Sequence, residues 1–208
     1  EDGIRDHCVT GVQTCALPIY RMLKPGQQCH KAAQVARTVL GQIARAFHFR
    51  DRTVFVQLYK QYVRPHLEFS VQSWSPWQEG DKDVLEKVQQ KVVGMVSGLK
   101  ATDYEGKLKE IGLETLEERR HQQDMAMMYK IMNGKDGLES ETWFERATDG
   151  PRRTRATDDD LNVKINHGRL EIQRGFFSVR VCEDWNRIPP GIKSDKVNQR
   201  IQTRVPAI

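Results

Sequence analysis

The spacing of hydrophobic residues predicts a mainly helical protein. Apolar positions recur every three or four residues over most of the stretch from 27 to 133, which is the period of an amphipathic helix. In the first predicted helix, over 27–47, Val35, Val39, Ile43 and Phe47 mark one face together with Leu40. A Pro25-Gly26 turn precedes this helix.

Start and stop signals divide the rest of this region into further helices. Asp51 is a typical N-cap for a second helix, which Pro65 is expected to interrupt. A connection rich in proline and tryptophan follows, and Trp74 and Trp77 are expected to anchor the core. A third helix is predicted over about 81–97. Two capping boxes then predict a short helix ending at Gly112 and a long one ending near Gly134, beginning at Thr102-x-x-Glu105 and Thr115-x-x-Glu118 respectively.

The long helix carries a methionine-rich stripe, which is more typical of an adaptable core than of a ligand site. Beyond it, residues 134–160 have the Gly, Asp and Pro content of a linker or exposed loop. Alternating apolar residues on either side of Asn166-His167-Gly168 predict a short β-hairpin. A last helix is expected over about 174–187, before Pro189-Pro190.

These predictions give a fold class and a division of the chain. We expect a helical, thumb-like bundle followed by a small α+β tail with one short β-hairpin. The expected parts are a disordered segment 1–19, a helical region 20–133, a linker or loop 134–160, and a hairpin with a C-terminal helix over 161–208.

Residues 1–19 do not read as part of a folded domain. They show neither helical nor strand periodicity, and they lack the basic and apolar regions of a signal peptide. Back-translation of residues 1–6 and 9–19 can give strings that look like the two arms of a common sequencing adapter, with His7 and Cys8 at the position of its sample index. We therefore interpret residues 1–19 as translated adapter and leave them out of the functional argument.

The net charge of +5 comes from one segment of the chain. Residues 20–70 contain nine lysines and arginines but only two acidic residues, whereas residues 71–208 contain 23 of each. Aromatic residues lie between these cations in the sequence. Such a combination suits a surface that follows phosphates and stacks on bases, although it is also compatible with a solvated helix face over an aromatic core.

No complete active site is visible in the sequence. The chain has no phosphate-binding glycine loop, no HExxH pair and no nucleophile elbow. The four cysteines form no CxxC pair, and the three aspartates Asp158, Asp159 and Asp160 have no supporting ligand group, so neither pattern predicts a metal site. No apolar run is long enough to span a bilayer, and we expect no membrane partner.

A series of motifs between about residue 23 and residue 190 resembles a known family. In order, the motifs are LKPGQQCHKAA, VLGQIARAF, LYKQYVRPHLEFSVQSWSPW, LEKVQQKVVGMVSGLK, YEGKLKEIGLETLEERR, DMAMMYKIMNG and GFFSVRVCEDWNRIP. They resemble the C-terminal region of reverse transcriptases from LINE-like, non-LTR retrotransposons of the jockey and chicken-repeat type. The chain departs from the usual family pattern at Val88–Gly94, where two positive charges are missing, and in the tail after residue 195.

The resemblance implies a function that the residues alone do not give. Residues 23–133 would be the thumb of an RNA-directed DNA polymerase and the segment after it, which hold template and primer, while the catalytic palm would lie upstream. This fragment would then be no enzyme and would hold no cofactor, although the parent polymerase would use Mg²⁺. Its partners would be RNA, DNA and the palm, in the nucleus or cytoplasm. Candidate phosphate contacts are Lys31, Arg37, Arg45, Arg52, Lys60 and Arg64.

Two other hypotheses remain open on the sequence. The chain could be an all-helical interaction module that docks on a protein through methionine and tryptophan surfaces. It could also be the translated relic of a retroelement with no selected function, in which case its core would not be consistent enough to unfold cooperatively.

Overall fold

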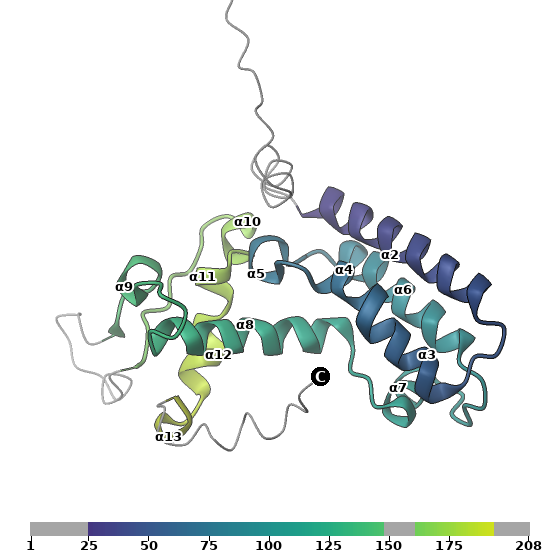
Figure 1. Cartoon of the computed structure of the whole chain (residues 1–208). Coiled ribbons are helices and arrows are strands. Elements are labelled where there is room, and N and C mark those ends of the chain that lie inside the picture. Colours follow the sequence, from purple (N-terminus) through teal and green to yellow (C-terminus); the bar gives the residue numbers. More distant parts are fainter. Residues whose placement is uncertain (1–24, 148–160, 194–208) are drawn as a thin grey trace, which may run out of the picture. The chain divides into compact units, whose positions relative to one another are not determined.

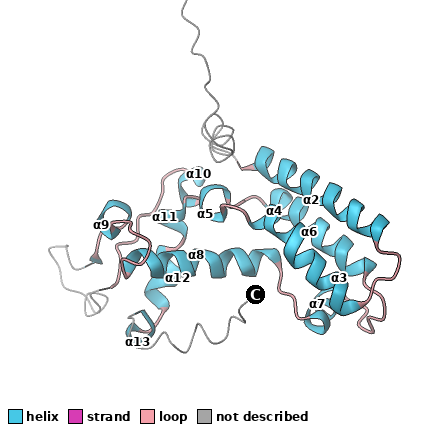
Figure 2. Ribbon diagram, viewed as in Figure 1, coloured by secondary structure: helices cyan, strands magenta, loops and turns pink. Residues whose placement is uncertain are grey.

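The computed structural model describes residues 25–147 and 161–193, which are mainly helical as predicted (Figures 1 and 2). The chain forms two compact units, Glu1–Arg119 and Arg120–Ile208. We call them unit 1 and unit 2 and describe each by itself. Residues 1–19, the segment 148–160 within the predicted linker, and the tail from residue 194 lie outside the described residues.

Unit 1 is an α-helical bundle. Its first part contains α2 (Gly26–Ala46), α3 (Arg52–Leu58), the π-helix η1 (Tyr59–Val63), α4 (Arg64–Glu68) and α5 (Val71–Trp74). Its second part contains α6 (Glu79–Met95), α7 (Tyr104–Ile111) and the beginning of α8 (Leu116–Met132). Helix α2 packs mainly on α6 and also on η1 and α4, while α7 packs on α6.

Small residues form the buried face of α2. Cys29, Ala32, Ala33, Ala36 and Leu40 are buried, whereas Val35 and Phe47, which the sequence pattern placed on the apolar face, are 46% and 41% exposed. Side chains of this size let two helix backbones approach closely, because little volume separates them. The predicted helix is therefore present. Of the expected apolar face, Leu40 is buried and Val39 and Ile43 pack against the core, whereas Val35 and Phe47 do not.

The second predicted helix continues through Pro65 instead of stopping there. At η1 the hydrogen bonding widens by one residue, so the Arg64 N–H donates to the Tyr59 carbonyl. Pro65 then lies at the start of α4. Because proline has no N–H and its ring clashes with the preceding turn of an α-helix, the widened turn is what lets the helical path continue.

Three of the predicted helix ends are confirmed and one cap is displaced. Asp51 caps α3 by accepting hydrogen bonds from the N–H groups of Thr53 and Val54. Gly112 ends α7 in the left-handed conformation at φ +65°, and Thr115 forms a capping box with Glu118 at the start of α8. At α7, however, the cap is Asp103, which accepts from the Gly106 N–H at 2.9 Å, so the predicted Thr102 box is wrong by one residue.

Unit 2 surrounds a second hydrophobic core. It contains most of α8, then α9 (Ser140–Trp143), α10 (Glu171–Arg174), α11 (Phe177–Arg180), α12 (Cys182–Arg187) and α13 (Pro190–Lys193). Met128, Ile131 and Met132 of α8 pack in this core with Trp185. The methionine stripe is thus core packing, as predicted, and Trp74 is likewise buried in the core of unit 1.

The predicted β-hairpin is not what the described residues show. Its second strand is replaced by the helical turn α10, and Val163 makes only an isolated antiparallel bridge to Arg146. The physical reason is that side chains of α12 form hydrogen bonds with the backbone N–H and carbonyl groups of the first predicted strand. The Asn186 side chain accepts from the Val163 N–H at 3.0 Å and donates to its carbonyl at 2.7 Å, while Trp185 Nε1 donates to the Leu161 carbonyl.

The predicted last helix over 174–187 is divided into shorter pieces. Phe177–Arg180 and Cys182–Arg187 are separate helices, and α13 begins at Pro190, where the sequence predicted an end. The boundary between the two units lies between Arg119 and Arg120, within α8. It comes earlier in the chain than the linker or loop that the sequence predicts over 134–160.

Candidate nucleic-acid interface

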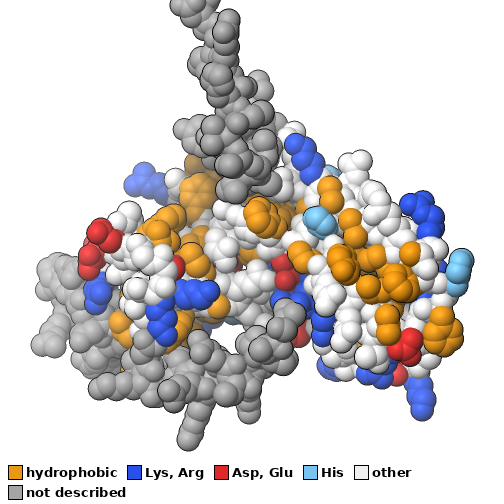
Figure 3. All heavy atoms as spheres, viewed as in Figure 1, with side chains coloured by type: hydrophobic (Ala, Val, Ile, Leu, Met, Phe, Trp, Pro, Cys, Tyr) orange, Lys and Arg blue, Asp and Glu red, His pale blue; other side chains and the backbone are white. Residues whose placement is uncertain are grey.

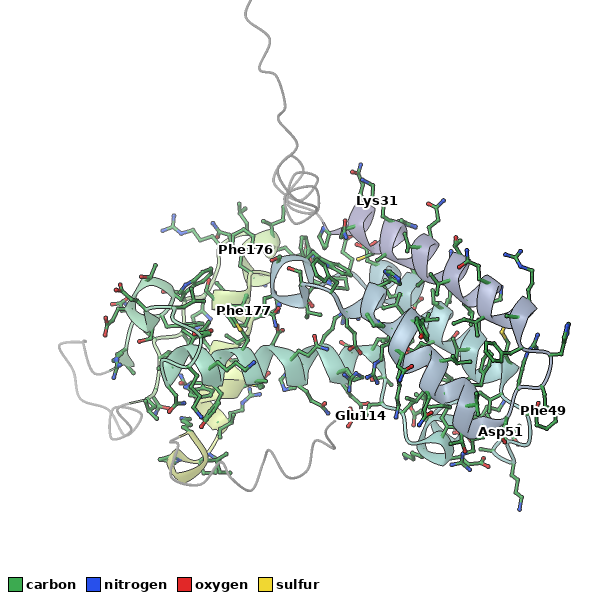
Figure 4. The ribbon with its side chains drawn as sticks, viewed as in Figure 1. Lys31, Phe49, Asp51, Glu114, Phe176 and Phe177 are labelled. Atoms are coloured by element: carbon green, nitrogen blue, oxygen red, sulfur yellow. The ribbon has the colours of Figure 1, made fainter. Side chains whose placement is uncertain are left out.

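The outer face of α2 carries no carboxylate and is polar except for Val35. Its sequence, GQQCHKAAQVARTVLGQIARA, contains no acidic residue. Lys31 and Arg45 are exposed, and neither makes an ion pair or hydrogen bond with the described residues. The Lys31 side chain extends away from the bundle (Figure 4). Helical geometry puts the exposed Gln34, Thr38 and Gln42 on the same side. The side-chain amides of the two glutamines therefore offer donors between the two cations, while the Thr38 hydroxyl donates to the Gln34 carbonyl.

Arg37 lies on the same helix but is directed toward a structural partner. Its Nη2 lies 3.5 Å from the carbonyl oxygen of Val84 on α6, the neighbouring helix. The side chain is exposed, and the remaining guanidinium donors leave it able to contact an anion. Arg37 therefore differs from Lys31 and Arg45, which form no hydrogen bond with the described residues.

Arg52 and Arg64 are engaged in ion pairs within unit 1. Arg52 lies 3.9 Å from Glu110. Arg64 lies 3.7 Å from Glu68, whose carboxylate also receives two hydrogen bonds from the guanidinium of Arg119. The side chains of Arg64 and Glu68 are only 13% and 10% exposed, and burial lowers the pKa of Arg64. We therefore assign Arg64 to the packing of unit 1 and not to its outer surface.

Lys60 lies on η1 and makes no ion pair with the described residues. It is half-buried, and the neighbouring ring of Tyr62 is 54% exposed. On the other side, Tyr59 is buried in the core. The six candidate residues thus separate into three without a partner, Lys31, Arg45 and Lys60, and three with structural contacts.

The aromatic residues of the basic segment separate in the same way. Phe55 and Tyr59 are 2% and 1% exposed and belong to the core, whereas Phe47, Phe49 and Tyr62 reach the surface. Figure 3 shows a group of hydrophobic side chains on the visible face of unit 1. The sequence could not separate the two groups, because basic and aromatic residues alternate from Phe47 through α3 and η1.

A buried hydrogen-bond network holds the helices behind this surface. The Tyr59 hydroxyl donates to the side-chain oxygen of Gln89, which is fully buried, and Gln89 Nε2 donates to the Glu114 carbonyl at 2.8 Å. Tyr104 donates to Glu86, whose other oxygen accepts from the Leu116 N–H at 3.1 Å. Burial raises the pKa of both tyrosines, which keeps them protonated. The network joins η1, α6, α7 and α8.

Two connections that are distant in the sequence meet at one end of unit 1. The Ser97 N–H donates to the Arg50 carbonyl at 3.2 Å, which joins the α2–α3 connection to the α6–α7 connection. Glu110 accepts from the N–H groups of Lys100 and Ala101 at 3.0 and 3.2 Å, and these hydrogen bonds, more than the nearby cations, lower the pKa of its carboxyl. Lys100 is therefore brought near Arg50 and Arg52. The sequence pattern missed Lys100, because it lies in the charge-balanced part of the chain.

Unit 2 offers a half-open pocket of about 260 Å³. His167, Arg174, Arg180 and Glu183 contribute to its lining. The guanidinium of Arg180 is already bound to both oxygens of Asp124, at 2.8 and 2.9 Å, and to the Gly175 carbonyl. Its donors therefore serve the packing of α8 against α11.

Other reactive groups of the described residues are enclosed. Cys29 and Cys182 are free thiols in the two cores, and burial raises the pKa of Cys182 to about 11. Within residues 25–147 and 161–193, no three His, Cys, Asp or Glu side chains gather as a metal site would require. In the same residues, none of the helices has both the length and the apolar content to cross a membrane.

Comparisons of the chain with protein-family models, curated proteins and solved structures give no match.

Proposed function

We propose that the chain is the nucleic-acid-gripping, thumb and post-thumb part of a RNA-directed DNA polymerase from a non-LTR retrotransposon. In this proposal the fragment has no polymerase activity of its own and holds a template and primer for an upstream palm. Binding would be independent of sequence, because the available cations would contact phosphates and not base edges.

The observation that supports the proposal most directly is the outer face of α2. Lys31 and Arg45 are separated by 14 residues, or about 21 Å along a helix. Nucleic-acid backbones carry negative charge at regular intervals over such a distance, and a face without carboxylates does not repel them. The acidic groups nearest in sequence, Asp51 and Glu68, are held by an N-cap and by arginines respectively.

Removing the two free cations of α2 tests this proposal. The full chain with Lys31→Gln and Arg45→Gln should bind a labelled RNA–DNA duplex roughly 10- to 30-fold more weakly near 0.1 M salt, measured by fluorescence anisotropy. The slope of log K against log salt should become shallower by about 1.8, since each lost phosphate contact removes about 0.9. Because both side chains are exposed, the variant should keep the far-ultraviolet circular dichroism of the parent.

The matched control removes two positive charges elsewhere. Lys91 on α6 and Lys130 on α8 are also exposed and also lack an ion pair with the described residues. Changing both to Gln should leave most of the affinity and the salt slope in place. If both double variants lost the same affinity, the loss would reflect net charge and not the position of Lys31 and Arg45. If the affinity of the parent chain did not fall with rising salt, the proposal would be contradicted altogether.

The alternative of a docking module finds less support. It relied on methionine and tryptophan surfaces, but Met128, Trp74 and Trp185 are enclosed in the two cores. Trp143 is 46% exposed and belongs to the short helix α9. A single exposed tryptophan is common on protein surfaces and does not define a docking face.

A further inference from the structure

The end of unit 1 where the two connections meet presents an aromatic ring among cations. We call residues 47–52 and 96–101 the two-loop end. Phe49 is 84% exposed there and lies at the far edge of the unit, away from the bundle (Figure 4). Phe47 is 41% exposed in the same connection. A phenylalanine with so little cover loses most of the hydrophobic stabilisation that burial would provide.

The backbone that carries Phe49 is fixed on both sides. Before it, the Phe47 N–H donates to the Ile43 carbonyl at 2.9 Å, which completes the end of α2. After it, the Arg50 carbonyl accepts from Ser97, and Asp51 caps α3. A ring presented by an ordered loop loses little conformational entropy when a flat partner stacks on it.

The two-loop end and the adjoining last turn of α2 contain more cations than carboxylates. Arg45, Arg50, Arg52 and Lys100 all belong to the two-loop end or to the last turn of α2. Arg50 Nε is buried and has no hydrogen-bond partner among the described residues. Asp51 and Glu110 accept from backbone N–H groups, and Glu110 also lies 3.9 Å from Arg52, so two carboxylates stand against four cations.

We propose that the two-loop end binds an unpaired base by stacking on Phe49, while the surrounding cations hold the adjoining phosphates. The inference rests on the proposed function and adds its substrate class, namely nucleic acid with a single-stranded segment beside the duplex. A base within a blunt duplex has both faces covered by its neighbours, whereas an unpaired base has a free face that an exposed ring can cover.

The test compares two substrates for the full chain by fluorescence anisotropy. One is a blunt RNA–DNA duplex, and the other is the same duplex with a single-stranded uridine overhang of about ten nucleotides, within the usual length of such sites. We expect the overhang substrate to bind more tightly. Phe49→Ala should lower its affinity roughly 5- to 100-fold and leave the blunt duplex unchanged, whereas Phe49→Trp should retain the preference.

A second exposed phenylalanine is the matched control. Phe69 is 52% exposed after α4, outside the two-loop end, and Phe69→Ala should leave the preference for the overhang intact. Photo-crosslinking with 5-iodouridine in the overhang should place the crosslink on Phe49 or Phe47. An overhang preference that survives Phe49→Ala, or crosslinks found only elsewhere, would overturn the inference and leave the proposed function standing. If the parent chain bound neither substrate, both would fail.

Discussion

At the scale of single residues, the structure separates cations that look equivalent in the sequence. Lys31 and Arg64 both belong to the basic segment, yet Lys31 extends into solvent and Arg64 is paired with Glu68. The i,i+4 spacing of Arg64 and Glu68 is visible in the sequence. The burial of this pair and the second guanidinium at Glu68, from Arg119, are not visible there, because Arg119 lies 55 residues beyond Arg64. Three of the six candidate residues predicted from the sequence therefore make structural contacts within unit 1. Only the tertiary structure could show which three.

The Glu68 cluster gives a prediction for stability. Glu68→Gln leaves Arg64 and Arg119 facing each other without a carboxylate between them, and both are partly withdrawn from water. The free energy of unfolding should fall by about 1–3 kcal/mol, less than for a fully buried pair. Urea denaturation followed by circular dichroism measures this change.

An exposed carboxylate provides the comparison. Glu79 pairs with Lys82 at 2.8 Å, but its side chain is 81% exposed. Glu79→Gln should change the free energy of unfolding by less than about 0.5 kcal/mol, since surface pairs contribute little. A loss at Glu79 as large as that at Glu68 would show that the burial of the Glu68 cluster does not matter.

At the scale of elements, the long helices and the short helices marked by caps were predictable, whereas the short helices of residues 161–193 were not. Helix α6, expected over 81–97, is observed at Glu79–Met95, and α2 differs from its prediction by one residue at each end. Periodicity over several turns fixes such helices. In residues 161–188, by contrast, the alternation of Val163 and Ile165 suggested a strand, but Asn186 supplies the hydrogen bonds that a second strand would have made. This contact is tertiary, so no local pattern could predict it.

Two glycines test the helix boundaries with opposite signs. Gly94 lies inside α6, and a Cβ added there would contact nothing within 4 Å. Gly94→Ala should therefore raise the free energy of unfolding by up to about 1 kcal/mol, because alanine loses less backbone entropy in a helix.

Gly112 ends α7 at φ +65°, where a side chain is strained. Gly112→Ala should lower the free energy of unfolding by about 1 kcal/mol or more. Thermal or urea unfolding of both variants decides the signs, and a stabilising Gly112→Ala would contradict the C-cap geometry.

At the scale of the whole molecule, each unit has its own core and each core holds one free cysteine. Cys29 is buried in unit 1 and Cys182 in unit 2. Thiol alkylation at increasing urea concentration, resolved by peptide mass spectrometry, therefore follows the unfolding of each unit in the same chain. At pH 8 the raised pKa keeps Cys182 in the unreactive thiol form, and burial also shields it from the alkylating reagent. Labelling of Cys182 should therefore require unfolding.

A core substitution shows whether the units unfold separately. Val88→Ala, at a fully buried position of unit 1, should cost about 2 kcal/mol and shift the Cys29 labelling curve to lower urea. We expect the Cys182 curve to stay in place. Equal shifts of both curves would mean that the chain unfolds as one cooperative body, whereas gradual labelling at all urea concentrations is what the relic hypothesis predicts.

The π-helix at Tyr59–Val63 also bears on the ancestry of the chain. A π-turn contains one residue more than an α-turn, which is the length that a single inserted codon would add. A relative with an uninterrupted α-helix here would have one residue fewer between Leu58 and Pro65. An alignment of the two sequences without a gap at this point would pair residues that are not structurally equivalent on one side of the π-helix. Lys60 and Arg64 are among the residues that such an alignment would misplace.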